Sequence, residues 1–292
     1  MKKWLKDDIN FLVENYPKYG VDYCVKSLNR TKGSINKKRN KLGIKTKDGV
    51  KGKNISKTRK LNNYKKYDVS NLITVSNKYA AYVLGYLWAD GHIIQNHSFL
   101  TSINLVKSDA EFLYKILISI NEGWKIGNEI KKYWKNSKGE IKQAQNQRII
   151  RIYSQELFYF LLNNDYGDKS VKSFKKIWRL IPENLKSFFI LGLYDGDGHF
   201  NYQLRKNKYH SGEFVITASY DYDWSILEDY FKKNNIEYSL YRFIVKLGKV
   251  SHIIVRKKES LCKLYDLLYF DDNFKGLERK HKKYLKYMLN VN

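Results

Sequence analysis

The chain has 292 residues and a formal net charge of +26, with 55 lysines and arginines against 29 aspartates and glutamates. Hydrophobic residues make up 43% of it, too many for a disordered chain, and its two cysteines exclude a disulfide scaffold and a cysteine-based zinc site. No apolar run approaches the roughly 18 residues that span a bilayer, so we expect no membrane partner. A charge excess of this size predicts a polyanionic partner, most commonly nucleic acid.

The first 45 residues predict a small helical unit. Apolar residues at helical spacing indicate a helix over residues 6–15, which we expect Tyr16 and Pro17 to end. A second short helix is expected over residues 21–28 and a third over about 33–42.

The third predicted helix is the basic one. Thr31 is expected to cap its start and Gly43 to stop it. Three short helices with a basic last one resemble a helix-turn-helix or Myb-like unit, whose third helix enters the major groove of DNA. A module for protein contacts is the alternative. The residues expected to contact DNA are Ser34, Asn36, Lys37 and Arg39.

Residues 46–75 predict a basic linker. Its apolar anchors are few. It continues a basic stretch from Lys26 to Lys66 that holds sixteen basic residues and one acid, Asp48, and this clustering favours a nucleic-acid face. Such a segment can follow a phosphate backbone, although a merely solvated spacer has the same composition.

From Asn77 onward a pattern of mixed helix and strand occurs twice. The segment AAYVLGYLWADGHI (80–93) aligns with KSFFILGLYDGDGHF (186–200) at an offset of 197 − 90 = 107 residues. An internal duplication of this size predicts two similar lobes, 76–183 and 184–292, related by a pseudo-twofold axis.

Each copy predicts a helix with a glycine at the same place. A glycine within a helix costs about 1 kcal/mol relative to alanine, so its recurrence favours a close crossing of Gly85 against Gly192. Asp90 and Asp197 then end two adjacent helices, where both the helix dipoles and each other's charge are unfavourable. Bound Mg²⁺ would offset this repulsion, and metal ions held between paired acids and a phosphate suit phosphodiester cleavage. The alternative is that Asp-Gly only ends a buried helix.

The segments VLGYLWADG (83–91) and ILGLYDGDG (190–198) resemble the two motifs of a single-chain LAGLIDADG homing endonuclease. The first departs at Trp88, where the family often has an acid. The resemblance implies two αββαββα lobes with saddle-shaped antiparallel sheets over duplex DNA. With the small all-α N-terminal domain predicted above, the expected fold class is α+β. The resemblance further implies a monomer that uses Mg²⁺ or Mn²⁺ to cleave both strands of a long asymmetric target across the minor groove, leaving short 3′ overhangs.

The resemblance also implies roles for particular residues. Asp90 and Asp197 would bind the catalytic metals, helped by the backbone carbonyls of Ala89 and Gly196.

The family uses one basic residue per lobe near each scissile phosphate, and Lys169 and Lys280 occupy the matching segments. Such a lysine would polarise water or stabilise charge that develops on the phosphate. Strand residues expected to contact the DNA grooves are Lys131, Lys132, Arg148, Arg151, Arg205, Lys208, Arg242, Lys246 and Arg256.

Two other functions stay open on the same fold, a catalytically silent DNA-binding regulator and an RNA-splicing maturase. Retention of both motif acids favours the nuclease, although maturases can retain them too. The first ten residues carry no apolar stretch of a secretory signal. We therefore expect the protein in the cytoplasm of a bacterial or phage host, or in an organelle with an AT-rich genome.

Overall fold

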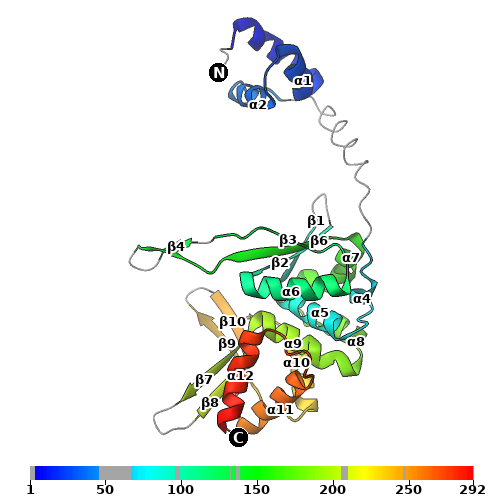
Figure 1. Cartoon of the computed structure of the whole chain (residues 1–292), viewed down its shortest axis with the longest axis vertical. Coiled ribbons are helices and arrows are strands. Elements are labelled where there is room, and N and C mark those ends of the chain that lie inside the picture. Colours follow the sequence, from blue (N-terminus) through cyan, green and yellow to red (C-terminus); the bar gives the residue numbers. More distant parts are fainter. Residues whose placement is uncertain are drawn as a thin grey trace. The chain divides into compact units, whose positions relative to one another are not determined.

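The fold is that of a computed structural model of the chain. It describes residues 4–45, 67–95, 99–131, 133–135, 139–204, 210–245 and 248–291. The chain divides into two compact units, Met1–Lys66 and Tyr67–Asn292 (Figure 1). Within the described ranges, no helix is both long enough and apolar enough to cross a membrane.

The first unit is helical, but the expectation that Pro17 ends its first helix is wrong. Helix α1 (Lys6–Leu28) continues through Pro17 and is interrupted by a kink at Gly20, where φ is +78° and the backbone is not helical. The helix expected over residues 21–28 is therefore confirmed as the segment after this kink. Proline loses one helical hydrogen bond, yet its fixed φ is compatible with a helix, and packing of the neighbouring buried Tyr16 offsets the loss. Glycine tolerates the left-handed φ of the kink.

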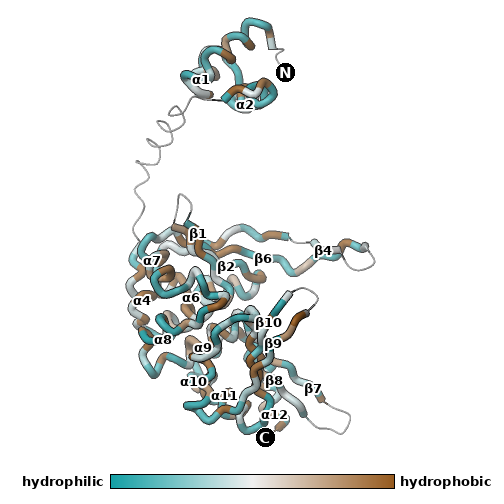
Figure 2. The backbone as a smooth tube through the Cα atoms, turned by 180° about the vertical axis from the view of Figure 1, so that it is seen from behind, coloured by the Kyte–Doolittle hydropathy of each residue, from teal (hydrophilic) through white to brown (hydrophobic). Residues whose placement is uncertain are grey.

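The second helix of this unit, α2 (Lys32–Lys41), begins as expected. The Thr31 hydroxyl accepts a hydrogen bond of 3.3 Å from the backbone amide of Ser34. Helix α2 is mostly hydrophilic (Figure 2), and Ile35 is its buried residue. The buried residues of this unit form a hydrophobic core of their own, made of Leu12, Tyr16, Cys24 and Ile35.

The second unit contains two αββαββα lobes, which confirms the predicted fold class. Short helix α4 (Ser70–Ile73) precedes the first lobe, and η1 (Tyr166–Asp168) and α8 (Lys175–Leu180) follow it. The first lobe consists of α5 (Lys78–Asp90), β1 (Gly91–Gln95), β2 (Phe99–Val106), α6 (Lys107–Ile120), β3 (Lys125–Ile126), β6 (Gln147–Tyr153) and α7 (Gln155–Asn163).

The second lobe repeats this order after the short helix η2 (Glu183–Leu185), and helix α12 (Glu278–Val291) follows it. Between β3 and β6, strands β4 (Tyr133–Lys135) and β5 (Ile141–Gln143) form a separate hairpin that extends from the first lobe (Figure 1). The elements of the second lobe are α9 (Lys186–Asp197), β7 (Gly198–Leu204), β8 (His210–Ser219), α10 (Ser225–Lys233), β9 (Ser239–Val245), β10 (Gly248–Val255) and α11 (Lys258–Tyr269).

Both four-stranded sheets are antiparallel and have the same topology, β1-β2-β6-β3 and β7-β8-β10-β9. Helices α6 and α7 pack on one face of the first sheet, and α11 and α12 on one face of the second. Side chains alternate between the two faces of a strand. We call the opposite face the open face; it carries Ser102 and Arg151 in the first sheet and His199 and His252 in the second.

Helices α5 and α9 cross side by side at the lobe interface (Figure 1), and glycines make the crossing possible. A Cβ atom at Gly85 would lie 2.0 Å from the carbonyl oxygen of Phe189, and one at Gly192 would lie 2.0 Å from the carbonyl oxygen of Tyr82. The predicted close contact of the two glycine-bearing helices is confirmed.

Because backbone lies against Gly85, the Gly85→Ala variant is expected to lower the free energy of unfolding by about 3 kcal/mol, the upper range for overpacking. Urea denaturation measures this change. Gly167→Ala is the matched control, since its Cβ would lie 3.5 Å from the nearest atom, and it should change stability by less than about 0.5 kcal/mol. A Gly85→Ala protein as stable as wild type would contradict the close crossing.

Candidate active site

The two motif acids end the crossing helices, Asp90 on α5 and Asp197 on α9. Their helix ends lie in contact, because a Cβ atom at Gly196 would lie 2.2 Å from the Cβ of Ala89. Burial, followed by the charge of Asp90, raises the pKa of Asp197 to about 6. The structure therefore brings the two acids into one electrostatic site, as the duplicated motif indicates.

The pKa of Asp90 is also raised, chiefly by burial, while the charges of Lys280 and Lys169 lower it in part. Both acids nevertheless keep exposed surface, so an ion from solution can reach them. The helix dipoles add partial negative charge at the same ends. Partial desolvation, the repulsion between the two acids and the helix dipoles each disfavour these charges, and a bound cation would relieve all three.

Lys169 reaches the end of α5 from the segment that follows η1. Its Nζ donates hydrogen bonds to the backbone carbonyls of Trp88 at 2.8 Å, Ala89 at 2.6 Å and Gly91 at 2.8 Å. These three bonds match the three N–H donors of an ammonium group. Lys169 therefore holds the C-terminal turn of α5.

Lys280, at the start of α12, does the same for α9. Its Nζ lies 2.7 Å from the carbonyl oxygen of Asp195, 3.5 Å from that of Gly196 and 2.5 Å from that of Gly198. These positions match the three carbonyls bound by Lys169 at the 107-residue offset, and the carbonyl of Tyr194, at 2.8 Å, is a fourth acceptor of Lys280. The two lysines thus occupy equivalent places in the two lobes.

Burial lowers the pKa of Lys169 and of Lys280 to about 8, and neighbouring carboxylates oppose that shift. The family resemblance predicts that these lysines act at the scissile phosphate, and that role stays a prediction. Their geometry adds a second role that the sequence did not indicate. Each ammonium satisfies helix-end carbonyls and places a positive charge beside the acids.

The segments that carry these lysines also bind the opposite lobe. In the first lobe, the backbone of Val171 accepts a 2.9 Å bond from the amide of Asp223, whose carboxylate accepts the Ser173 hydroxyl at 2.8 Å. In the second, the Nε of Arg279 lies 3.1 Å from both carboxylate oxygens of Asp109 on α6. Sequence reasoning missed these pairs because no motif links residues so far apart in the chain.

Asp195 is a further residue that sequence reasoning missed. It is 1% exposed, and its Oδ2 accepts bonds from the Tyr82 hydroxyl at 2.8 Å and the Leu277 amide at 2.7 Å. Burial raises its pKa to about 7. The equivalent residue in the first lobe, Trp88, donates from its Nε1 to the Tyr222 hydroxyl at 3.2 Å. Each position thus ties its helix to the other lobe, which accounts for the departure of Trp88 from the family motif.

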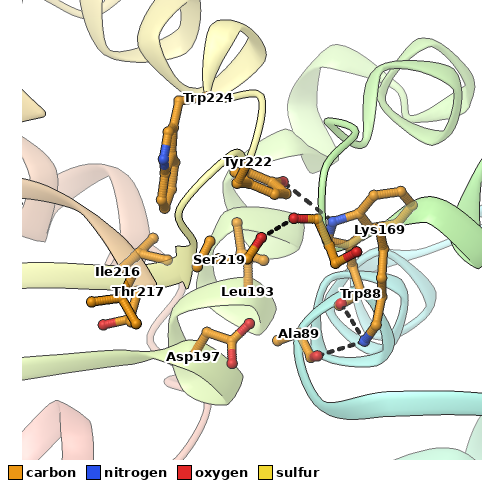
Figure 3. A pocket seen from close by; sticks show the side chains of 13 residues that line it. Trp88, Ala89, Lys169, Leu193, Asp197, Ile216, Thr217, Ser219, Tyr222 and Trp224 are labelled. Carbon is orange, nitrogen blue, oxygen red and sulfur yellow. Dashed lines mark hydrogen bonds between the residues drawn. The ribbon is translucent and has the colours of Figure 1, made fainter. Parts of the chain in front are cut away.

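A pocket of about 350 Å³ opens beside Asp197 and Lys169. Figure 3 shows Asp197 next to Ala89, with the amine of Lys169 bonded to the Trp88 and Ala89 carbonyls. Aromatic, aliphatic and small polar side chains form most of the rest of the wall: Trp88, Ser170, Leu193, Ile216, Thr217, Ala218, Ser219, Tyr222, Trp224 and Val250. Of the two acids, Asp197 lines this pocket.

The donors at this site fit Mg²⁺ shared with a phosphate better than a metal held by protein alone. Among the described residues, no three or more histidine, cysteine or acidic side chains are grouped to hold a metal. Two carboxylates with water and phosphate oxygens are the ligands that Mg²⁺ prefers. The carbonyl of Ala89 already accepts Lys169 at 2.6 Å, whereas that of Gly196 lies 3.5 Å from Lys280 and is less engaged.

The predicted DNA contacts of the first unit separate into two groups. Ser34 and Lys37 line a hollow together with Lys41 and other basic residues. Arg39 instead turns inward, with its guanidinium 5.2 Å from the centre of the Tyr16 ring. Asn36 lies half-buried on the same helix.

The predicted contacts of the strands also separate. Arg151 and Arg256 lie on the open faces, whereas Arg148 and Arg242 lie on the helix-covered faces. Arg148 is 3.7 Å from Glu111 of α6, and the Nε of Arg242 donates to the carbonyl of Tyr220 at 2.9 Å.

Sequence alone could not separate the strand arginines, because a shift of one residue in register moves a side chain to the other face. Lys131 is exposed after β3. The expected contacts Lys132, Arg205, Lys208 and Lys246, and most of the predicted linker, lie outside the described residues.

The sequence matches no protein-family model and no curated protein. Among solved structures, the chain is similar to the LAGLIDADG meganuclease I-AabMI bound to uncleaved DNA, with 16% identity over 73% of this chain and 89% of that chain and a TM-score of 0.48. It is also similar to the I-SmaMI LAGLIDADG homing endonuclease bound to cleaved DNA, with 17% identity over 73% and 88% of the two chains and a TM-score of 0.46.

Proposed function

We propose that the protein is a site-specific endonuclease that cleaves both strands of DNA with Mg²⁺ or Mn²⁺. The observation that carries this proposal is the pairing of Asp90 and Asp197 at the ends of two crossing helices, where burial raises the pKa of both. A bound divalent cation would offset that unfavourable charge and, together with a phosphate, would stabilise the charge of the reaction.

The two lobes supply equivalent groups to two strands. Each contributes one acid, one lysine-held helix end and one open sheet face. The strands of a DNA duplex are themselves related by local twofold axes, so a pseudo-twofold protein can present one acid to each strand. We propose that the protein acts as a monomer on a long asymmetric site. It would cleave across the minor groove and leave short 3′ overhangs.

A plasmid library with randomised inserts tests this proposal. In Mg²⁺ the full chain is expected to linearise a small subset of plasmids, and sequencing of the ends should show paired cuts with 3′ overhangs. In EDTA we expect no cutting. Selective duplex binding without cleavage in Mg²⁺ would instead indicate a silent regulator, and preference for a structured RNA would indicate a maturase.

We also propose that the first unit binds the DNA backbone through its basic hollow. The double variant Lys37→Gln/Lys41→Gln should reduce the slope of log affinity against log salt concentration by about two, because each of the two lysines neutralises one phosphate. Fluorescence anisotropy at several KCl concentrations measures this slope. Lys18→Gln, an exposed lysine of α1, is the control, and an unchanged slope in the double variant would point to a protein-contact module.

A further inference from the structure

The open faces of the two sheets can be compared row by row. Gly91 and Gly198 directly follow the two acids and begin equivalent rows, opposite Ile103 and Ile216 respectively. The rows three residues further along each strand are therefore equivalent as well, and both lie on the open face. In the first sheet this row is Ile94, Leu100 and Tyr153; in the second it is Asn201, Glu213 and Arg256.

The two rows differ in chemistry although their backbones match. The row of the first sheet is apolar, and its Tyr153 is 40% exposed. The row of the second sheet carries a charge pair, since the Nε of Arg256 donates to the Oε1 of Glu213 at 2.6 Å. The side chain of Arg256 is 47% exposed, so its guanidinium is accessible from the open face.

Arg256 is held in place by its neighbours. Besides Glu213, its Nη1 donates to the Tyr241 hydroxyl at 3.2 Å, and the amide of Asn201 lies 3.4 Å from the other oxygen of Glu213. A guanidinium has five N–H donors in a rigid plane, and these contacts use two of them. The remaining donors belong to the two terminal nitrogens, which suit a planar ligand with two adjacent acceptors.

A guanine fits this arrangement better than a phosphate does. Its O6 and N7 atoms accept a bidentate pair from arginine in the major groove. The carboxylate of Glu213 already neutralises the charge of Arg256, which weakens attraction to a phosphate but leaves the directional donors in place. The apolar row of the first lobe matches the thymine methyl group instead.

We propose that Arg256, positioned by Glu213, reads a guanine in the half-site under the second lobe. At the symmetry-related base pair under the first lobe, the row of Ile94, Leu100 and Tyr153 favours a thymine. One pair of equivalent rows thus makes the target asymmetric. This inference rests on the proposed function, because it assumes that duplex DNA lies on the open faces.

Selection of bound duplexes from a randomised library by the full chain in EDTA tests the inference independently of cleavage. Wild type should enrich one guanine that Arg256→Ala loses, with discrimination at that position falling about tenfold or more and other positions unchanged. Arg256→Gln should shift the preference there to adenine, since glutamine pairs with the N6 and N7 atoms of adenine. Tyr153→Arg should create a guanine preference at the symmetry-related position.

Arg148→Gln is the matched control, because Arg148 also contacts a glutamate but lies on the helix-covered face. It should leave the selected sequence unchanged. An unchanged preference in Arg256→Ala, or a uniform loss of affinity for all sequences, would overturn the inference. A wild-type protein that selects this guanine but fails to cut the selected duplex in Mg²⁺ would overturn the proposed function alone, and a lack of any duplex selectivity would overturn both.

Discussion

The Asp90→Asn and Asp197→Asn variants are each expected to lose double-strand cleavage by about a hundredfold or more in Mg²⁺, while their affinity for target DNA stays close to that of wild type. An amide in place of either carboxylate removes a negatively charged ligand from the metal site, and metal stabilisation of the reacting phosphate contributes several kcal/mol. Single-turnover cleavage of a supercoiled plasmid measures the rate. The affinity should persist because the open faces are unchanged. Full cutting by either variant would reject the proposed site.

The Asp197→Asn variant should also gain stability when no divalent cation is present. The pKa of Asp197 is about 6 in the folded protein against about 4 in the unfolded chain. A raised carboxyl pKa means that the stability contributed by this group is fully present below about pH 4 and is lost as pH rises through 6. Because Asp197 keeps exposed surface, solvent screens its charge and the loss at pH 7 is reduced to about 1 kcal/mol, which the variant avoids.

Urea denaturation in EDTA at pH 4 and pH 7 measures this effect. The stability difference between Asp197→Asn and wild type should be near zero at pH 4 and should rise to about 1 kcal/mol in favour of the variant at pH 7. Asp272→Asn is the control, because the side chain of Asp272 is 97% exposed. Mg²⁺ should stabilise wild type more than the variant. Equal stability of the two proteins at both pH values would contradict the electrostatic account of the site.

The Lys280→Met variant is expected to lower the free energy of unfolding by about 3 kcal/mol or more and to lose cleavage. Methionine leaves the carbonyls of Asp195 and Gly198 without their buried donor and removes the positive charge near the acids. Lys169→Met should have a similar effect at the end of α5. Chemical denaturation and plasmid cleavage measure the two losses together. Lys282→Met is the control, since Lys282 is 69% exposed and should change stability by less than about 0.5 kcal/mol.

The pH dependence separates the charge of these lysines from their support of the fold. Their pKa is about 8 in the folded protein and about 10.4 in the unfolded chain. Between these pH values the unfolded chain binds more protons than the folded protein, so the linkage does not lower the free energy of unfolding as pH rises. We expect cleavage to decline as pH rises through about 8 while the protein remains folded. A lysine variant that is as stable as wild type but cuts slowly would show that the lysine acts at the scissile phosphate and does not support the helix end.

Local patterns predicted the parts of the fold that depend on neighbours in sequence. The Thr31 cap, the duplicated glycine-bearing helices and the meeting of their terminal acids all follow from short segments. The end of the first helix at Pro17 was predicted wrongly, because packing of a buried side chain outweighs one missing hydrogen bond. The roles of the site residues remain predictions that the experiments above address.

The sequence by itself determined that the chain carries two equivalent motifs, since a glycine and an acid at the same helical spacing occur twice. Only the tertiary structure decided what surrounds the acids. The carbonyl bonds of Lys169 and Lys280, the burial of Asp195 and the open-face position of Arg256 each join segments far apart in the chain. Such contacts depend on strand register and on packing between lobes, and neither leaves a periodic pattern in the sequence.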